Sequence, residues 1–323
     1  MLHRRTQTVL EVSPQASNVP HTTSWMVTAM ALIVQLTLNT LQAGSVYVLF
    51  ALGLTLIFGV MGVVNFAHGQ FFTLSALLTS VIVPAFREAL GMGVALAFTL
   101  ASTISIGAVL ALAALVYHFG FRHYLRDTVG SFILSVGILL FLEGVFLWFF
   151  GGVPRVVPNI APGELRGLGA AIELQRLVVF AIAVIVTVLL YLMLVFTRFG
   201  RAIRATAEDA GAATLQGIRD KRILLYGFMV GSFLAAVSGC LIAPIAVITP
   251  AVGNDYLVKG FIIIIIGGLG SVPGAILGGL TIAFIESVVG YYFDGTMATI
   301  GMFCVVGVLL LVRPQGMLGY VQH

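Results

Sequence analysis

A few side chains that could take part in chemistry lie inside apolar segments of this sequence, where polar groups are costly. Glu143 and Glu286 are carboxylates within apolar runs, and Asn65 and His68 interrupt another. Ionisable residues in such segments mostly face a bundle interior or a water-filled pathway. Glu143 is therefore a candidate pathway residue, whereas Glu286 also suits a helix end at the membrane interface. Asn65 and His68 suit either contact with a solute or hydrogen bonding to unwound backbone.

The sequence lacks the motifs of the common hydrolytic and nucleotide-binding enzymes. It contains no HExxH motif, no GxSxG motif and no paired-carboxylate motif. Its two lysines, Lys221 and Lys259, do not follow a glycine, so a P-loop is impossible. No metal-ligand spacing occurs, and Cys240 and Cys304 lie in apolar runs as small core residues. We therefore expect no enzymatic activity, no cofactor and no bound metal.

The longest polar stretch between apolar segments is a basic loop at residues 198–222. Within it, residues 199–222 carry five of the sixteen Lys and Arg of the chain, and Arg198 stands just before them. The alanines and the absence of proline in its first part predict a short helix, which Gly217 would end. That helix would have a face of small residues at helical spacing: Ile203, Ala207, Ala210 and Thr214.

Two functions are open for this basic loop. Arg204 and Glu208 stand four residues apart, close enough to pair on one helix face. A basic loop between membrane spans is expected on the cytoplasmic side. A helix there would serve as a handle for a soluble partner, or the loop would be a solvated linker whose arginines only set the topology.

Composition identifies an integral membrane protein. The chain is 60% hydrophobic and 9% charged, with a mean hydropathy of +1.11, whereas a soluble domain has about 25% charged residues. Many separate apolar runs of helical length predict an all-α polytopic transmembrane helical bundle of about eight to ten spans rather than a β-barrel. The net charge of +4 comes from arginines at span ends, which is a topology signal and no footprint for nucleic acid.

The chain divides into a short polar extension and one transmembrane domain. Residues 1–24 are polar and contain prolines, which predicts a disordered N-terminal extension. Residues 25–323 form the transmembrane domain. Its first apolar stretch, 25–58, is either one long tilted helix or two short ones. Residues 151–175, rich in glycine and proline, predict an external loop.

The arginine distribution predicts the topology. With the 198–222 loop in the cytoplasm, alternating spans place the C-terminus at Arg313 on the same side. They also place the basic loop around Arg122 and Arg126 in the cytoplasm. Each basic loop then obeys the positive-inside rule.

Two segments share an aliphatic run, a glycine pair three residues apart, a break and a new helix. The first reads LTLIFGVMGVVNFAHGQ and the second FIIIIIGGLGSVPGA. Glycine-interrupted hydrophobic segments at matching places in two halves point to a transport site, because unwound backbone at membrane depth must be buried or line a cavity. The alternative is that these glycines only allow close helix packing. The predicted pathway residues are Gly59, Gly62, Asn65, His68, Gly69, Gly267, Gly270, Ser271, Gly274 and Glu143.

Three stretches, from about Gln35 to the C-terminus, resemble signatures of the LivH-type permeases of bacterial branched-chain amino-acid ABC transporters. They are GLTLIFGVMGVVNFAHGQ, RATAEDAGAATLQGI and GGLGSVPGAILGG, in that order. The resemblance implies a multi-pass permease of the bacterial inner membrane. It also implies partners: a second, LivM-like permease, two cytoplasmic ATPase subunits and a periplasmic solute-binding protein.

The resemblance also assigns a role to the basic loop, as the segment that couples to the ATPases. The implied coupling residues are Arg201, Arg204, Glu208, Asp209 and Gly217. The loop departs from the EAA pattern of other importers, since Gly217 lies nine residues after Glu208 and Thr214 holds the earlier glycine position.

Relatives in this family carry leucine, isoleucine and valine, and also urea, short amides and aromatic acids. The predicted function is import of a small, branched-chain amino acid. The alternative is an autonomous secondary transporter or channel for a small neutral solute such as urea or an amide.

Overall fold

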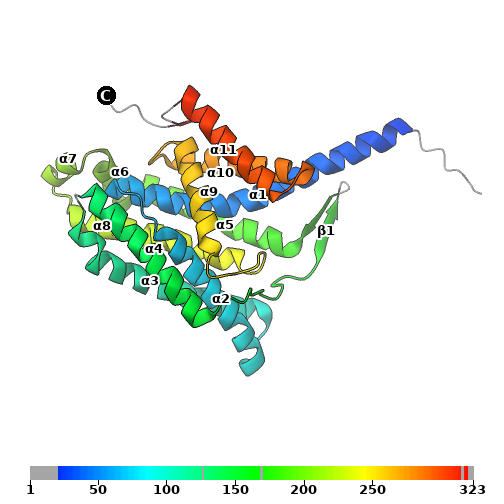
Figure 1. The fold of residues 1–323 in the computed structure, drawn as a ribbon, viewed down its shortest axis with the longest axis horizontal. Coiled ribbons are helices and arrows are strands. Elements are labelled where there is room, and N and C mark those ends of the chain that lie inside the picture. Colours follow the sequence, from blue (N-terminus) through cyan, green and yellow to red (C-terminus); the bar gives the residue numbers. More distant parts are fainter. Residues whose placement is uncertain (1–20, 126, 168–169, 314–315, 319–323) are drawn as a thin grey trace, which may run out of the picture.

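A computed structural model of the chain describes residues 21–125, 127–167, 170–313 and 316–318. In this part of the chain eight helices are long and apolar enough to cross a membrane, so the predicted all-α polytopic bundle is confirmed (Figure 1). The helices are α1 (His21–Met61), α2 (His68–Leu90), α3 (Val94–Phe119), α4 (Thr128–Phe150), α5 (Leu174–Phe196), α6 (Arg198–Glu208), α7 (Ala210–Leu215), α8 (Asp220–Ile242), α9 (Val252–Gly267), α10 (Val272–Tyr292) and α11 (Gly295–Val312), with a 3-10 turn η1 (Phe121–His123).

Helix α1 is the central element of the bundle (Figure 1). It is one continuous helix of 41 residues, so the alternative of two short helices over 25–58 is wrong. Every residue from Val46 to Ile57 is buried, because α5, α8, α9 and α10 all pack against this helix. Helix α1 begins at His21, inside the predicted extension 1–24, and residues 1–20 lie outside the described residues.

Glycines set the distance between the central helices. A methyl group on Gly53 in α1 would lie 2.7 Å from the carbonyl oxygen of Gly231 in α8 and 2.8 Å from the His68 ring. A methyl group on Gly279 in α10 would lie 2.6 Å from the Val48 side chain. Small residues of this kind let backbones approach closely in a membrane bundle. The middle of α1 is therefore held in direct contact with α8 and α10.

Helices α4 and α11 are attached much more loosely than the central helices. Only 17% of the apolar window of α4 and 11% of that of α11 are buried within the chain, against 67% for α8. Helix α11 packs mainly on α10 and α9 and lies along one edge of the bundle (Figure 1). Both helices therefore present broad apolar surfaces to lipid or to another subunit.

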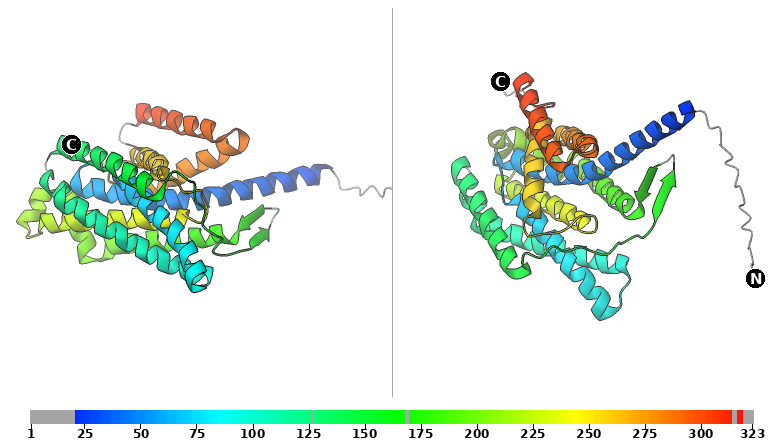
Figure 2. Two further views of the ribbon diagram at one scale, coloured as in Figure 1. Left: turned by 60° about the horizontal axis from the view of Figure 1, so that its bottom comes forward. Right: turned by 45° about the vertical axis from the view of Figure 1, so that its right-hand side comes forward.

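The predicted external loop at 151–175 contains a small β-hairpin. Strands β1 (Glu164–Gly167) and β2 (Ala170–Glu173) pair antiparallel. The amide of Ala171 donates to Oε1 of Gln35 at 3.1 Å, which ties the hairpin to the protruding first part of α1; the two extend from the bundle side by side (Figure 2). The same loop reaches the α8–α9 connection through paired hydrogen bonds between Arg155 and Ile248.

Candidate functional site

The two predicted helix breaks are present and lie against each other. Helix α1 ends at Met61, followed by Gly62 with a φ of 66°. Helix α9 ends at Gly267, followed by positive φ values at Gly268 and Gly270. A methyl group on Gly59 would lie 3.7 Å from the Cα of Gly270. Two interruptions far apart in the sequence therefore meet at one place in the bundle.

The first break returns the chain into the core before α2 begins. His68, at the start of α2, is fully buried, and its Nε2 lies 3.3 Å from the carbonyl oxygen of Phe50 in the middle of α1. Asn65 Oδ1 accepts a hydrogen bond from the amide of Ala67 at 3.0 Å. Asn65 therefore binds backbone within the break, which is one of its two predicted roles, whereas the backbone partner of His68 lies in the unbroken part of α1.

Several buried polar atoms at the start of α2 have no hydrogen-bond partner within the described residues. They are Nδ2 of Asn65, Nδ1 of His68 and Oε1 of Gln70. Unsatisfied buried polar atoms are rare and need a specific reason. Because these atoms lie beside the first break, this part of the core could form hydrogen bonds with water or with a polar solute.

The second break is shaped by close packing. Ser271 caps α10, since its Oγ accepts a hydrogen bond from the amide of Gly274 at 3.2 Å. A methyl group on Gly267 or on Gly274 would collide with the backbone of the other. These two glycines therefore allow direct backbone contact between the end of α9 and the start of α10, as the packing alternative predicted. Gly270, in contrast, is exposed next to the first break.

A segment after α11 completes the second break, and the sequence analysis missed it. The amides of Met317 and Leu318 donate to the carbonyl oxygens of Ile266 and Gly267 at 2.7 and 3.1 Å. These bonds satisfy carbonyls at the end of α9 that a helix terminus leaves free. Gly316 is needed there, because its φ is 78° and a methyl group would lie 2.7 Å from the Gly268 amide.

A chain of polar side chains joins α2, α9 and α4 (Thr128–Phe150). Nε2 of Gln70 donates to Oδ1 of Asn254 at 3.3 Å, and Nδ2 of Asn254 donates to Oε2 of Glu143 at 3.1 Å. The predicted pathway carboxylate Glu143 is therefore linked to the start of α2. Gln70 and Asn254 were not predicted, because their contacts cross helices that are distant in the sequence.

A closed ring of three polar groups joins α1, α9 and α10. Nζ of Lys259 lies 2.7 Å from Oε1 of Glu286 and 2.8 Å from the Tyr47 hydroxyl, which donates to Oε2 of Glu286 at 2.6 Å. The ammonium also lies 4.8 Å from the centre of the Tyr47 ring. Glu286 is thus paired in the bundle and does not stand alone at an interface. The Lys259–Glu286 pair was not predicted, because the two residues lie 27 positions apart on different helices.

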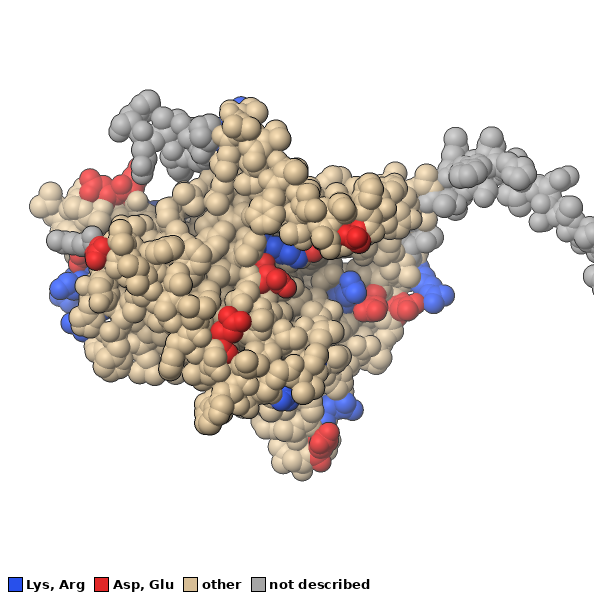
Figure 3. All heavy atoms as spheres, in the orientation of Figure 1, with Lys and Arg blue, Asp and Glu red and all other residues tan. Residues whose placement is uncertain are grey.

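Charged groups gather beside α9 on one face of the molecule. Figure 3 shows a few acidic and basic atoms near the middle of one face, apart from the further charged atoms at the left, right and lower margins of that face. On α9, Asp255 is exposed and Lys259 is partly exposed. Glu143 and Glu286, on neighbouring helices, are also partly exposed. Such groups are costly against lipid and belong in a protein interior or a water-filled cavity.

The basic loop forms two helices and not the single helix that was predicted. Helix α6 ends at Glu208, and Asp209 adopts an extended conformation with a φ of −153°. The Asp209 side chain then accepts hydrogen bonds from the amides of Gly211 and Ala212, which starts α7. The predicted small-residue face is wrong, since Ile203 and Ala207 lie in α6 whereas Ala210 and Thr214 lie in α7. The buried residues of the two helices are Gly200, Ile203, Thr206 and Ala213.

Other predictions about the loop have mixed outcomes. Gly217, with a φ of 83°, ends α7 as predicted, and the Ile218 amide donates to the Ala213 carbonyl in a Schellman arrangement. The Arg204–Glu208 pair is wrong, because neither residue belongs to an ion pair of the described residues and both are exposed. The cationic side chains of the loop are all exposed: Arg198, Arg201, Arg204, Arg219, Lys221 and Arg222.

The fold and these features define a polytopic helical transport protein whose pathway candidates are two interrupted helices. The family described as branched-chain amino acid transport system, permease component, matches residues 36–313. The chain therefore belongs to this family of permease components.

Individual relatives are similar over most of their length. The high-affinity branched-chain amino acid transport system permease protein LivH of Salmonella typhimurium is 29% identical over 87% of this chain and 94% of its own. The ribose import permease protein RbsC of Escherichia coli is 26% identical over 77% of this chain and 76% of its own. Among solved structures, PsaBC from Streptococcus pneumoniae in complex with Fab matches with 16% identity and a TM-score of 0.46, over 86% of this chain and 91% of that chain.

Replacing one member of the ring should destabilise the protein more than replacing both ionic partners. Lys259→Met leaves Glu286 without its counter-charge, and removing one partner of a fully buried ion pair costs about 3–5 kcal/mol. The cost is smaller here because the two side chains are 20% and 32% exposed. In the double variant Lys259→Met/Glu286→Leu no charge is left unpaired, so the apparent Tm in detergent should recover. An equal decrease in apparent Tm for the single and the double variant would contradict a stabilising ion pair between Lys259 and Glu286.

Cysteine accessibility tests whether the first break opens during turnover. A cysteine at Asn65, in a protein whose native cysteines are replaced, should react with small polar thiol reagents only while the transporter is cycling, because Asn65 is buried at rest. A cysteine at Phe228, which is fully buried in the helix core, is the matched control and should stay protected. Protection of both positions during active transport would count against a pathway at this break.

Proposed function

We propose that this chain forms the membrane pathway of an ATP-driven importer for a small amino acid with a branched aliphatic side chain. The observation that carries the proposal is the meeting of two helix breaks inside a bundle of the permease family. Within a membrane, unwound backbone is tolerated only where it is buried in protein or lines a cavity. The unsatisfied polar atoms of Asn65, His68 and Gln70 beside it support passage of a polar head group.

The solute class follows from the surroundings of the breaks. An amino acid carries one ammonium and one carboxylate, and the backbone amides at a helix start can receive such a carboxylate. The polar chain from Gln70 to Glu143 offers an acceptor for an ammonium group. Phe66, which lies in the first break and packs against Phe132 and Phe261, offers apolar contact. The name of the LivH relative supports a branched-chain amino acid as the solute. The ribose import permease relative makes a sugar the solute to compare with it in transport assays.

We propose that one of the two cytoplasmic ATPase subunits of the assembly docks on the α6–α7 segment. The chain has no P-loop lysine of its own, so ATP hydrolysis by the P-loop route would take place on another protein. Helix α6 exposes three cationic side chains, and three more are exposed at the start of α8: Arg198, Arg201 and Arg204, and Arg219, Lys221 and Arg222. Asp209 fixes the bend between α6 and α7. ATP binding would move this segment and, through α5 and α8, the central bundle.

We propose that the charged face beside α9 meets a second permease subunit of LivM type. Asp255, Lys259 and Glu143 are at least partly exposed on the isolated chain, and a bilayer does not tolerate such groups well. The loosely packed helices α4 and α11 supply apolar surface for the same contact. A periplasmic solute-binding protein would deliver the amino acid to the hairpin side of the assembly.

The proposed location is the bacterial inner membrane, with the 198–222 loop and the C-terminus in the cytoplasm. The Tyr117 hydroxyl donates to the carbonyl of Lys221 at 3.3 Å, so the basic loop after α3 lies beside the basic loop before α8. The segment after α11 binds the end of α9. Clustering of arginines at this end agrees with the positive-inside rule.

Charge reversal in α6 tests the docking proposal. Arg204→Glu should abolish co-purification of the ATPases, or reduce it at least about tenfold, because loss of a buried charged contact at an interface costs about 2–5 kcal/mol. Arg87→Glu is the control, since Arg87 is also exposed but lies in the last turn of α2 (His68–Leu90), outside the α6–α7 segment. Pull-down of the complex and ATP-dependent leucine uptake are the measurements. Unchanged coupling in the Arg204 variant and in a Glu208→Arg variant would overturn the proposal.

A further inference from the structure

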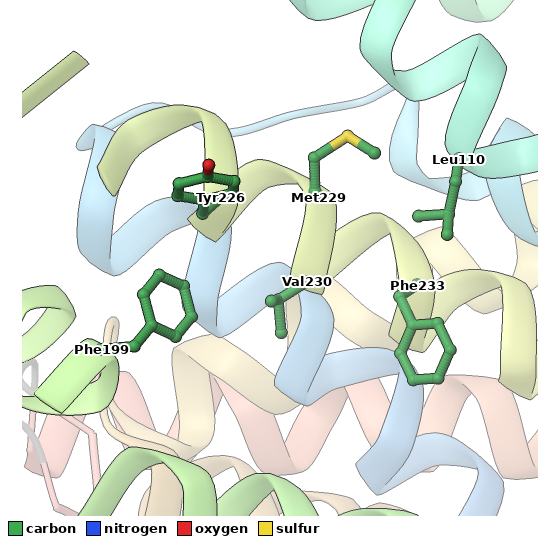
Figure 4. A pocket seen from close by; sticks show the side chains of 6 residues that line it. All are labelled: Leu110, Phe199, Tyr226, Met229, Val230 and Phe233. Atoms are coloured by element: carbon green, nitrogen blue, oxygen red, sulfur yellow. The ribbon is translucent and has the colours of Figure 1, made fainter. Parts of the chain in front are cut away.

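An apolar groove lies on the outside of the bundle, and no residue of the two helix breaks lines it. It has a volume of about 420 Å³ and is lined by residues from α3, α6 and α8 (Figure 4). The lining side chains are Leu110, Phe199, Tyr226, Met229, Val230 and Phe233. Phe199 and Tyr226 meet edge to face, with ring centres 5.9 Å apart, at one end of the groove. The proposed pathway uses none of these residues.

The groove follows one stripe of α8 from its basic end toward the middle of the bundle. Tyr226, Val230 and Phe233 recur at helical spacing, and Tyr226 and Phe233 are 51% and 36% exposed. Seven residues of helix span about 10 Å, which fits within one leaflet of a hydrocarbon core about 30 Å thick. The depth and the apolar lining match an acyl chain from the leaflet next to the basic loop.

Positive charge stands at the basic end of this stripe. Arg222 lies four residues before Tyr226, so it occupies the same face of α8. Arg198 directly precedes Phe199. Both arginines are exposed, and neither takes part in an ion pair of the described residues. Basic pockets between transmembrane helices on the cytoplasmic side are suited to anionic lipid head groups.

We propose that this groove binds an anionic phospholipid, with an acyl chain along Tyr226 to Phe233 and the phosphate at Arg222 and Arg198. An uncharged lipid would fill the groove but leave the two arginines without a counter-charge. A free phosphate would satisfy the arginines but leave the apolar lining unused. Because Phe199 belongs to α6, the bound lipid contacts the segment on which ATPase docking is proposed, although lipid binding itself does not depend on that proposal.

Lipid titration of the purified, delipidated chain tests this site. By native mass spectrometry, phosphatidylglycerol should bind more tightly than phosphatidylcholine. Arg222→Gln should weaken phosphatidylglycerol binding about five-fold, and the double variant with Arg198→Gln about thirty-fold, since each cation near an anionic head group contributes about 1 kcal/mol. Arg87→Gln, outside the groove, is the control and should leave the affinity unchanged. Inorganic phosphate at millimolar concentration should not compete.

A groove-filling variant separates the acyl-chain contact from the charge. Val230→Trp should block the groove and remove the preference for phosphatidylglycerol, while size-exclusion chromatography reports whether the variant stays folded. If it misfolds, the two arginine variants still decide, because Arg198 and Arg222 are exposed and outside the core. Equal affinity for both lipids, unchanged affinity in the double arginine variant, or full competition by phosphate would each overturn the proposal.

Discussion

A backbone that crosses a membrane must satisfy its amides and carbonyls within the protein, and this constraint governs how the two broken helices are built. Unbroken helices meet it automatically. At the first break Asn65 supplies an acceptor for the amide of Ala67. At the second, Ser271 caps α10, and the amides of Met317 and Leu318 serve the end of α9. Residues 316–318, which follow α11, are therefore a structural part of the second break.

The same constraint explains how charge is arranged within the bundle. Lys259, Glu286 and Tyr47 bind one another in a closed ring, which limits the cost of burying two ions. The ring fastens the α9–α10 hairpin to α1, the helix against which α5 and α8 also pack. Movement of the hairpin during transport would then stretch or exchange these bonds. The close contact of Gly53 with Gly231 fixes α1 against α8, whereas Gly279 in α10 packs the hairpin itself against Val48 of α1.

Features that depend on local sequence were predictable, and features that depend on contact between distant segments were not. Composition predicted the membrane bundle, and the glycine spacing predicted both breaks. The bend at Asp209 had a local signal, because Asp is a preferred N-cap residue, but the surrounding alanines favoured one continuous helix. The Lys259–Glu286 pair and the Asn254–Glu143 bond join different helices, so spacing could not reveal them. The role of Gly316 depends on where α11 leads the chain.

The most direct test is uptake of radiolabelled leucine into proteoliposomes that contain this chain with or without its co-purifying subunits. A pathway subunit driven by separate ATPases should give no flux alone, and should give uptake only with the ATPases, the binding protein and ATP. Leucine or urea flux through the chain alone, independent of ATP, would contradict that account and would identify an autonomous channel or secondary transporter.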